Sequence, residues 1–520
     1  MSLARNVATV GSATFASRLL GFARDIAIAD LFGAGLRADA FFVAFQFTNL
    51  IRRVLAEGAL NAAVVPLYLR ARDEGGESAA GAFAGRLIGT AAFGLICTVG
   101  VLAFAMPLIV AVLAPGFIGG GPRLTTAVEL GRLMLPYLAF AGPVAVLMGV
   151  LNANGRFAAA AFATAAFNST VLVALAFVFA LHTGDSILSG EIVACGVAIA
   201  GVSQLALVGI AVWFGPARVR PLTVSFGPEI RRFLALAIPG LVASGIPQIT
   251  VIAGVMVASS SRSAVSWIYY ANRLIELPLG MVGIAIGTVL VPAFAHAVRS
   301  GDKNEIAQVE SRGLELALGL ALPAAIALAV LAEPIVRVLF ERGAFLRADT
   351  AATAAALAAF ALGLPGHVLV KTFSPVFFAR EDTATPMRAA LFGFAIAIIG
   401  SLSLMPAFGH VGIAFAIAFS GWASAILLGV LIARRIGFAL DGAARSRLPR
   451  IALSALLMGA GVEAARRGLL PWLTGEGGNA TRALALAAVI VFGLAVYVGL
   501  LRLLNVTSPQ QLIGAMRRRA

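Results

Sequence analysis

Long apolar segments alternate with short polar connections along the whole chain, and this pattern predicts membrane-spanning helices. A helix needs about 20 consecutive apolar residues to cross a bilayer, whereas a barrel strand needs about ten residues of alternating character. The apolar segments of this chain are long and continuous, so we predict an all-α, polytopic membrane protein. Fourteen spans are expected, at residues 7–34, 40–69, 83–113, 128–152, 159–181, 190–214, 231–258, 265–295, 313–340, 350–379, 387–407, 411–433, 449–470 and 482–504.

Composition supports the membrane assignment. Of the 520 residues, 60% are hydrophobic and only 12% are charged, which lies outside the range of soluble domains. The formal net charge of +15 would suggest nucleic acid in a soluble protein. Here the basic residues fall mainly in the connections expected on one side of the membrane, by more than two to one. The positive-inside rule then predicts cytoplasmic N- and C-termini, and we expect no nucleic-acid partner.

An internal repeat at an offset of about 226 residues predicts two related lobes. The run at residues 63–66, AVVP, returns as VLVP at residues 289–292. Transporters built from repeats place their site near the bilayer midplane, where the repeats meet. The predicted domains are residues 1–225 (six helices), 226–440 (six helices) and 441–520 (two further helices and a basic tail). Because the transport path would lie within one chain, we expect a monomer.

Charged residues stand inside the first two predicted spans. A charge at the bilayer centre costs about 2.5 to 3.5 kcal/mol on insertion scales, so such residues face a polar cavity or a partner. The sequence therefore predicts an electropositive chamber within the membrane. The residues concerned are Arg18, Arg24, Asp25, Asp39, Arg52, Arg53 and Glu57.

Helical spacing suggests acidic or polar partners for some of the arginines but not for all of them. Arg18 and Asp25 fall on nearly one face of a helix, and Arg273 and Glu276 are helix neighbours. A third set on one face comprises Asn49, Arg53 and Glu57. These groups either lock the helices together or bind an anion, and the excess of arginine favours an anion such as phosphate.

Weaker candidates lie elsewhere. Lys371, deep in the tenth span, either reaches toward the membrane surface or joins the chamber. The connection at residues 380–383 is expected to be a solvated turn rather than a cation site. The four histidines show no metal spacing, and there is no phosphate-binding GxxxxGK[ST] loop. No metal, catalytic residue or cofactor is predicted.

Several segments together resemble the MurJ (MviN) family of bacterial lipid II flippases, within the multidrug/oligosaccharidyl-lipid/polysaccharide exporter superfamily. The resemblance extends over the whole chain, including the fourteen spans. Its motifs are SRLLGFARD at residues 17–25, FGAG and DAFFVAF within 32–45, NLIRRVLAEGA at 49–59, PGF at 115–117 and SWIYYANRLIELP at 266–278.

The resemblance implies a flippase that moves lipid-linked peptidoglycan precursor to the outer leaflet by alternating access. It implies that Arg18, Arg24, Arg52 and Arg273 engage the substrate, with Asp39, Arg53 and Glu57 contributing. From the residues themselves we add Asn49, on the helix face of Arg53 and Glu57, to the predicted binding set, and Asp25, Glu276 and Lys371 as supporting residues. The last two spans are implied to form a groove for the lipid tail. One departure from the family pattern is Asn272, where an acid can stand before Arg273, and it leaves the partner of Arg273 open.

Alternative functions remain open from the sequence. They are a flippase for another lipid-linked glycan, a cation-coupled exporter of the same superfamily and a non-transporting scaffold for cell-wall assembly. The arginine excess argues against an exporter of cationic drugs. The energy source is also open among the membrane potential, protons and sodium ions, since an interior-negative potential favours outward movement of an anion.

Overall fold

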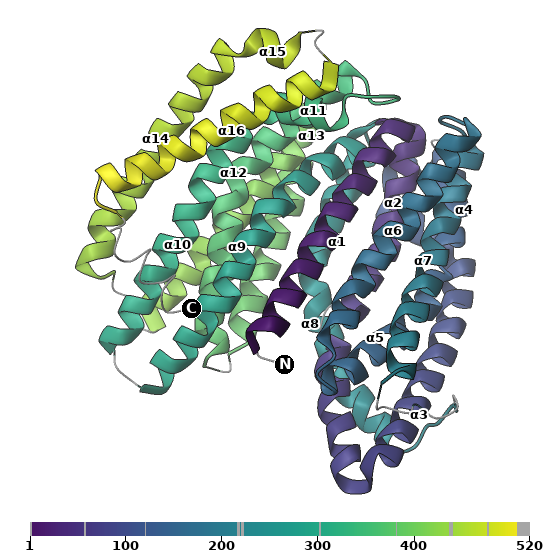
Figure 1. Cartoon of the computed structure of the whole chain (residues 1–520). Coiled ribbons are helices and arrows are strands. Elements are labelled where there is room, and N and C mark those ends of the chain that lie inside the picture. The colour runs from purple at the N-terminus through teal and green to yellow at the C-terminus, as the bar shows by residue number, and fades with distance from the viewer. Residues whose placement is uncertain are drawn as a thin grey trace. The chain divides into compact units, whose positions relative to one another are not determined.

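The computed structural model is built of helices, in agreement with the predicted class (Figure 1). It describes residues 3–56, 59–119, 121–215, 219, 223–300, 303–380, 382–435, 440–475 and 478–506. The described residues fall into two compact units. The N-terminal unit comprises Met1–Ser266 with Arg342–Leu346, and the C-terminal unit comprises Trp267–Glu341 with Arg347–Ala520.

The N-terminal unit is a bundle in which helices distant in sequence lie together. Helix α1 packs on α6, α2 on α4, and α5 lies against both α3 and α7. Its elements are α1 (Leu3–Phe32), α2 (Leu36–Ala56), α3 (Ala59–Leu113), η1 (Pro115–Phe117), α4 (Pro122–Met134), α5 (Tyr137–Ala153), α6 (Phe157–Leu181), α7 (Ile187–Trp213) and α8 (Pro228–Ala258). The first residues of α9 (Ala264–Ser300) also belong to this unit.

The C-terminal unit centres on α10, α12 and α13, which pack in that order. Helices α14 and α16 dock onto α10, partly through a hydrogen bond of 2.7 Å from the Tyr497 hydroxyl to the Gly319 carbonyl. This unit contains most of α9, then α10 (Lys303–Val330), α11 (Ala332–Phe340), α12 (Arg347–Phe378), α13 (Ala384–Arg435), α14 (Gly442–Gly468), α15 (Leu470–Thr474) and α16 (Gly478–Leu503).

Nine helices in the described part of the chain are long and apolar enough to cross a membrane. Two of these helical stretches, Ala63–Leu113 and Ala384–Arg435, each cover parts of two predicted spans. They are interrupted where the backbone leaves helical geometry, at Gly75 and Gly76 in α3 and at Gly409 in α13. The multi-span membrane architecture is thus confirmed, while the count of fourteen and the domain boundaries at 225 and 440 stay predictions.

Candidate functional site

A buried cluster of polar side chains joins α1, α2 and α6 in the N-terminal unit. Arg24 is 5% exposed and Asp25 is fully buried. The Nε and Nη2 atoms of Arg24 donate to Asp25 Oδ1 over 3.0 and 2.7 Å, and Nη1 donates to Asn168 Oδ1 over 3.0 Å. The guanidinium also lies 4.8 Å from the ring centre of Phe45. Three nearby groups, Asp25, Asn168 and Phe45, therefore stabilise a cation that lipid would exclude.

Asn168 connects this cluster to the backbone of two helices, and sequence reasoning missed it. Its Nδ2 atom donates to the carbonyl of Ser17 in α1 over 3.0 Å and to that of Thr164 in α6 over 3.3 Å. The amide thus fixes Arg24 relative to both α1 and α6. An asparagine within the otherwise apolar segment 157–181 was the available signal.

Arg24 takes the carboxylate that helical spacing offers to Arg18. Asp25 pairs with Arg24, its neighbour in sequence, although helical spacing placed Asp25 on the face of Arg18. Arg18 is half-buried and, in the ranges that the structure describes, makes no hydrogen bond or ion pair. Among the predicted arginines, Arg18 thus keeps a guanidinium that an anion can engage.

Arg52 is held on α2 by two groups. Its Nε and Nη2 atoms donate to Asn49 Oδ1 over 3.0 and 2.8 Å, and its guanidinium lies 5.3 Å from the ring centre of Phe167. Arg53, the next residue, is half-buried, and Glu57 lies outside the described residues.

Asp39 holds the turn that leads into α9. Its Oδ1 accepts from the Ser266 backbone N–H over 3.0 Å and from the Ser266 hydroxyl over 2.6 Å, while Oδ2 accepts from the Ser263 N–H over 2.8 Å. A carboxylate at a helix N-terminus is favourable for both hydrogen bonding and the helix dipole. It also supports Ser263, whose φ of 63° is unusual for a non-glycine residue. A substrate-binding role for Asp39 stays a prediction.

The C-terminal unit contains the remaining candidates. Arg273 Nη1 and Glu276 Oε2 form an ion pair of 2.7 Å, which gives Arg273 the partner that the sequence left open. Lys371 is exposed on α12, and its side chain covers Gly283 of α9. An added Cβ at Gly283 would lie 3.2 Å from Lys371 Nζ, so the absence of a side chain there makes room for the ammonium group.

The connection before α13 is a helix cap. Asp382 accepts from the backbone N–H of Thr385 over 2.9 Å and from its hydroxyl over 2.6 Å. These hydrogen bonds lower the pKa of the Asp382 carboxyl below its usual value. This capping geometry accords with the expected turn. Within the described ranges, no three His, Cys, Asp or Glu side chains are grouped as metal ligands would be.

Helices suited to crossing a bilayer, together with arginines buried among them, define a polytopic membrane transporter. Solved structures share this fold. A lipid II flippase MurJ in an inward closed conformation aligns with a TM-score of 0.77 at 23% identity, covering 94% of this chain and 97% of the other. An inward-facing MATE-family multidrug resistance transporter of the MOP superfamily aligns with a TM-score of 0.66 at 14% identity, covering 81% and 94%.

Sequence comparison is more specific than the fold. The family model "Lipid II flippase MurJ" matches residues 28–476. A probable lipid II flippase MurJ of Rhizobium meliloti (strain 1021) is 40% identical, covering 96% of this chain and 93% of the relative. The lipid II flippase MurJ of Burkholderia cenocepacia is 32% identical, covering 82% and 83%. The chain belongs to the MurJ family of lipid II flippases, and it is accordingly a transporter rather than an enzyme.

Proposed function

We propose that this protein moves lipid II, the lipid-linked peptidoglycan precursor, from the inner to the outer leaflet of the bacterial cytoplasmic membrane by alternating access. Family membership supports the substrate. The observation that carries the residue-level proposal is Arg18, a half-buried arginine on α1, in the first predicted span, with no hydrogen bond or ion pair among the described residues. A cation in that setting is costly unless water or an anion solvates it.

Three arginines receive the diphosphate of the substrate in this proposal. Arg18 supplies the readily available guanidinium, and Arg52 adds a charge that Asn49 orients without neutralising. Arg24 is fixed by Asp25 and contributes mainly to the shape of the site. The planar guanidinium offers paired N–H donors to phosphate oxygens, which favours arginine over lysine for this task.

The remaining predicted residues have supporting roles. Arg273, partly neutralised by Glu276, adds charge from the C-terminal unit. Asp39 maintains the α9 turn, and Arg53, Glu57 and Lys371 set the local potential. No metal or other cofactor takes part. The protein acts as a monomer with both termini in the cytoplasm, as the distribution of basic residues supports.

The membrane potential drives the cycle in this proposal. An interior-negative potential favours outward movement of an anion by about 2.3 kcal/mol per charge per 100 mV, and a doubly charged diphosphate gains about twice that. Coupling to protons or sodium ions is the alternative. If transport in vesicles is undiminished when the potential is clamped to zero, the voltage-driven version is wrong.

The deciding experiment measures outward movement of labelled lipid II in energised vesicles for Arg18→Ala and Arg70→Ala at equal protein abundance. We expect Arg18→Ala to lose at least about tenfold in transport, corresponding to about 1.4 kcal/mol, because a charged hydrogen bond is worth 1.5–3 kcal/mol. Arg70→Ala is the matched control, since Arg70 is an exposed arginine whose ion pair with Glu74 is also exposed.

The two results separate transport from scaffolding. Loss of transport by Arg18→Ala with unchanged abundance and melting temperature supports substrate recognition. If Arg18→Ala transports lipid II as well as Arg70→Ala does, Arg18 does not act on the substrate. Arg18→Lys sharpens the test, because it keeps the charge but loses the planar fork and should recover only part of the activity.

A further inference from the structure

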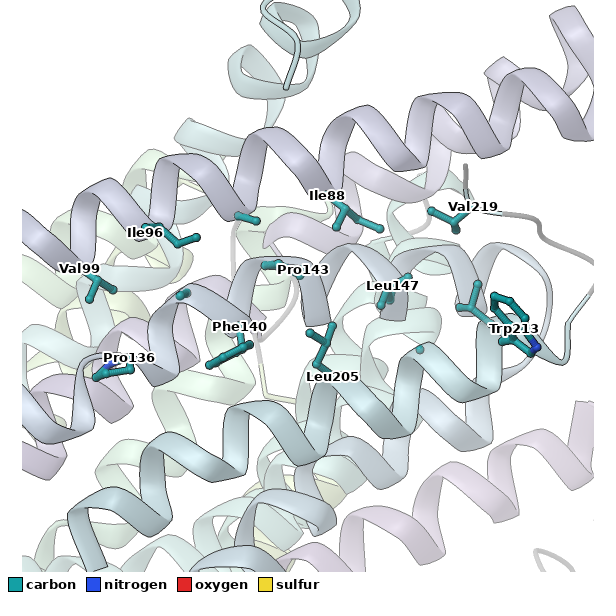
Figure 2. A pocket seen from close by; sticks show the side chains of 14 residues that line it. Ile88, Ile96, Val99, Pro136, Phe140, Pro143, Leu147, Leu205, Trp213 and Val219 are labelled. Atoms are coloured by element: carbon teal, nitrogen blue, oxygen red, sulfur yellow. The ribbon is translucent and has the colours of Figure 1, made fainter. Parts of the chain in front are cut away.

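An apolar groove runs along the N-terminal unit, apart from the polar cluster. It has a volume of about 1020 Å³ and is lined by residues of α3, α5 and α7 and by Val219. Figure 2 shows Phe140, Pro143 and Leu147 along α5, which lies between α3 and α7, and Pro136 immediately before α5. Ile88 and Ile96 on α3 and Leu205 and Trp213 on α7 form the two sides.

The groove exists because small residues occupy positions where larger ones would fill it. One such small residue lies on each of the three helices: Ala92 on α3, Ala139 on α5 and Gly209 on α7. A Cβ added at Gly209 would meet no heavy atom within 4 Å. The rims are exposed, with Ile96 59% and Trp213 84% accessible. Within a bilayer this surface meets hydrocarbon, so a flexible apolar chain is the matching occupant.

The length of the groove fits one leaflet. From Ile88 to Val99, α3 advances eleven residues, or about 16 Å at 1.5 Å per residue. The hydrocarbon core is about 30 Å thick, so one leaflet is about 15 Å deep. A phospholipid acyl chain spans that depth, whereas a polyprenyl chain is considerably longer. The match in length therefore favours a phospholipid over the tail of the transported substrate.

One end of the groove is basic. Trp213 stands there, as is typical of aromatic residues at a membrane surface. Arg156 lies beside it, since its Nη1 atom donates to the carbonyl of Ala211 near the end of α7. Arg156 is half-buried and has further N–H donors.

We propose that the groove of α3, α5 and α7 binds an anionic phospholipid, with an acyl chain along α5 and its phosphate at Arg156. The site is separate from the arginines assigned to lipid II. The assignment of the bound phospholipid to the inner leaflet rests on the proposed function, because cytoplasmic termini would place Arg156 at the cytoplasmic surface of the membrane. The rest of this proposal does not depend on the orientation of the chain. A bound phospholipid would fill the space between α3 and α7 and stabilise their packing on α5.

The test counts phospholipids bound to the purified full-length protein by native mass spectrometry after incubation with phosphatidylglycerol. Gly209→Phe should fill the groove and weaken this binding at least about tenfold. Gly94→Phe is the matched control, because Gly94 is also a helical glycine with open space around its Cβ but does not line the groove. If the two variants bind phosphatidylglycerol equally, the site is not this groove. Ala139→Ile provides a second filling variant should Gly209→Phe not fold.

A headgroup comparison tests the role of Arg156. With Arg156→Gln, the preference for phosphatidylglycerol over phosphatidylcholine should fall about fivefold, because one basic residue near a membrane surface contributes about 1 kcal/mol to the binding of anionic lipid. Arg156→Lys keeps the charge and should retain the preference. An unchanged preference in Arg156→Gln would overturn the assignment of the phosphate. Competition by a polyprenyl phosphate for the same position would overturn the choice of occupant. Arg18→Ala, expected to lose transport, should still bind phospholipid, so this proposal and the proposed function fail separately.

Discussion

The N-terminal unit contains two sets of packed helices that differ in chemistry. One set buries charged side chains, and the other is lined by apolar side chains. In the set formed by α1, α2 and α6, Arg24, Asp25 and Asn168 form a hydrogen-bonded cluster that is almost fully buried. In the set formed by α3, α5 and α7, small apolar residues leave a groove of about 1020 Å³. The polar set is held together by hydrogen bonds between its own side chains, whereas the apolar set leaves space beside its helices.

This difference shows how each set is stabilised. Buried charges depend on specific partners, because each loses its hydration on burial. The apolar set depends on backbone contact and on dispersion, which are spread over many atoms. We therefore expect single substitutions in the polar set to have larger effects than substitutions beside the groove.

Arg24→Ala should have the largest effect, because it removes the ion pair that Arg24 forms with the fully buried Asp25 carboxylate. Breaking a buried pair in this way typically costs about 3–5 kcal/mol. We expect lower abundance and a lower melting temperature in detergent, together with lost transport. Adding Asp25→Asn should restore part of the stability but not the transport. Normal abundance of Arg24→Ala alone would show that the pair does not stabilise the fold, and transport by the double variant would show that Arg24 is dispensable for function.

Gly89→Ala should have an intermediate effect. Gly89 lies on α3 beside the groove, and an added Cβ would lie 2.6 Å from the Thr223 carbonyl oxygen and 2.9 Å from its backbone nitrogen. The same segment is held by Thr90, whose hydroxyl accepts from the Ser225 N–H over 3.0 Å. Because backbone must move, we expect a cost of about 1–3 kcal/mol, measured as a lower melting temperature with transport per molecule retained. Gly94→Ala is the control, because a Cβ added at Gly94 would meet no heavy atom within 4 Å. Equal melting temperatures of the two variants would show that the segment at Thr223 moves without a cost in stability.

The sequence located the polar set because charge within apolar spans is conspicuous. Arg24 and Arg52 belong to a group of charged residues inside two otherwise largely apolar segments, and the cost of inserting charge makes such positions informative. The pairing was not predictable by helical spacing, which favoured Arg18 over Arg24 as the partner of Asp25. Side chains of adjacent residues usually point in different directions from a helix, but the long side chain of Arg24 can bend back to reach Asp25. Asn168, on a helix distant in sequence, accepts a hydrogen bond from Arg24 and so fixes this rotamer.

The groove could not be predicted from the hydrophobic pattern. Ala92, Ala139 and Gly209 read as ordinary residues of apolar helices, and nothing local shows that they lie against one another. Their juxtaposition arises because α3 and α7 both pack on α5. Similarly, α9 is anchored by Asp39, more than 220 residues before it in the chain, a contact that no local pattern encodes.

Asn49 offers the smallest and most selective test of the polar set. Its side-chain oxygen accepts two hydrogen bonds from Arg52, so Asn49→Ala should remove both and reduce transport by about fivefold, near 1 kcal/mol. Asn49→Asp keeps the acceptor but adds a negative charge beside Arg52. If the substrate meets that arginine as a cation, Asn49→Asp should transport less than Asn49→Ala although its ion pair is stronger. If Arg52 only packs the helices, the order should reverse, because a carboxylate then holds Arg52 at least as well as the amide does. Initial rates of lipid II movement at equal abundance decide between the two, with Arg70→Ala again as the reference for an exposed change.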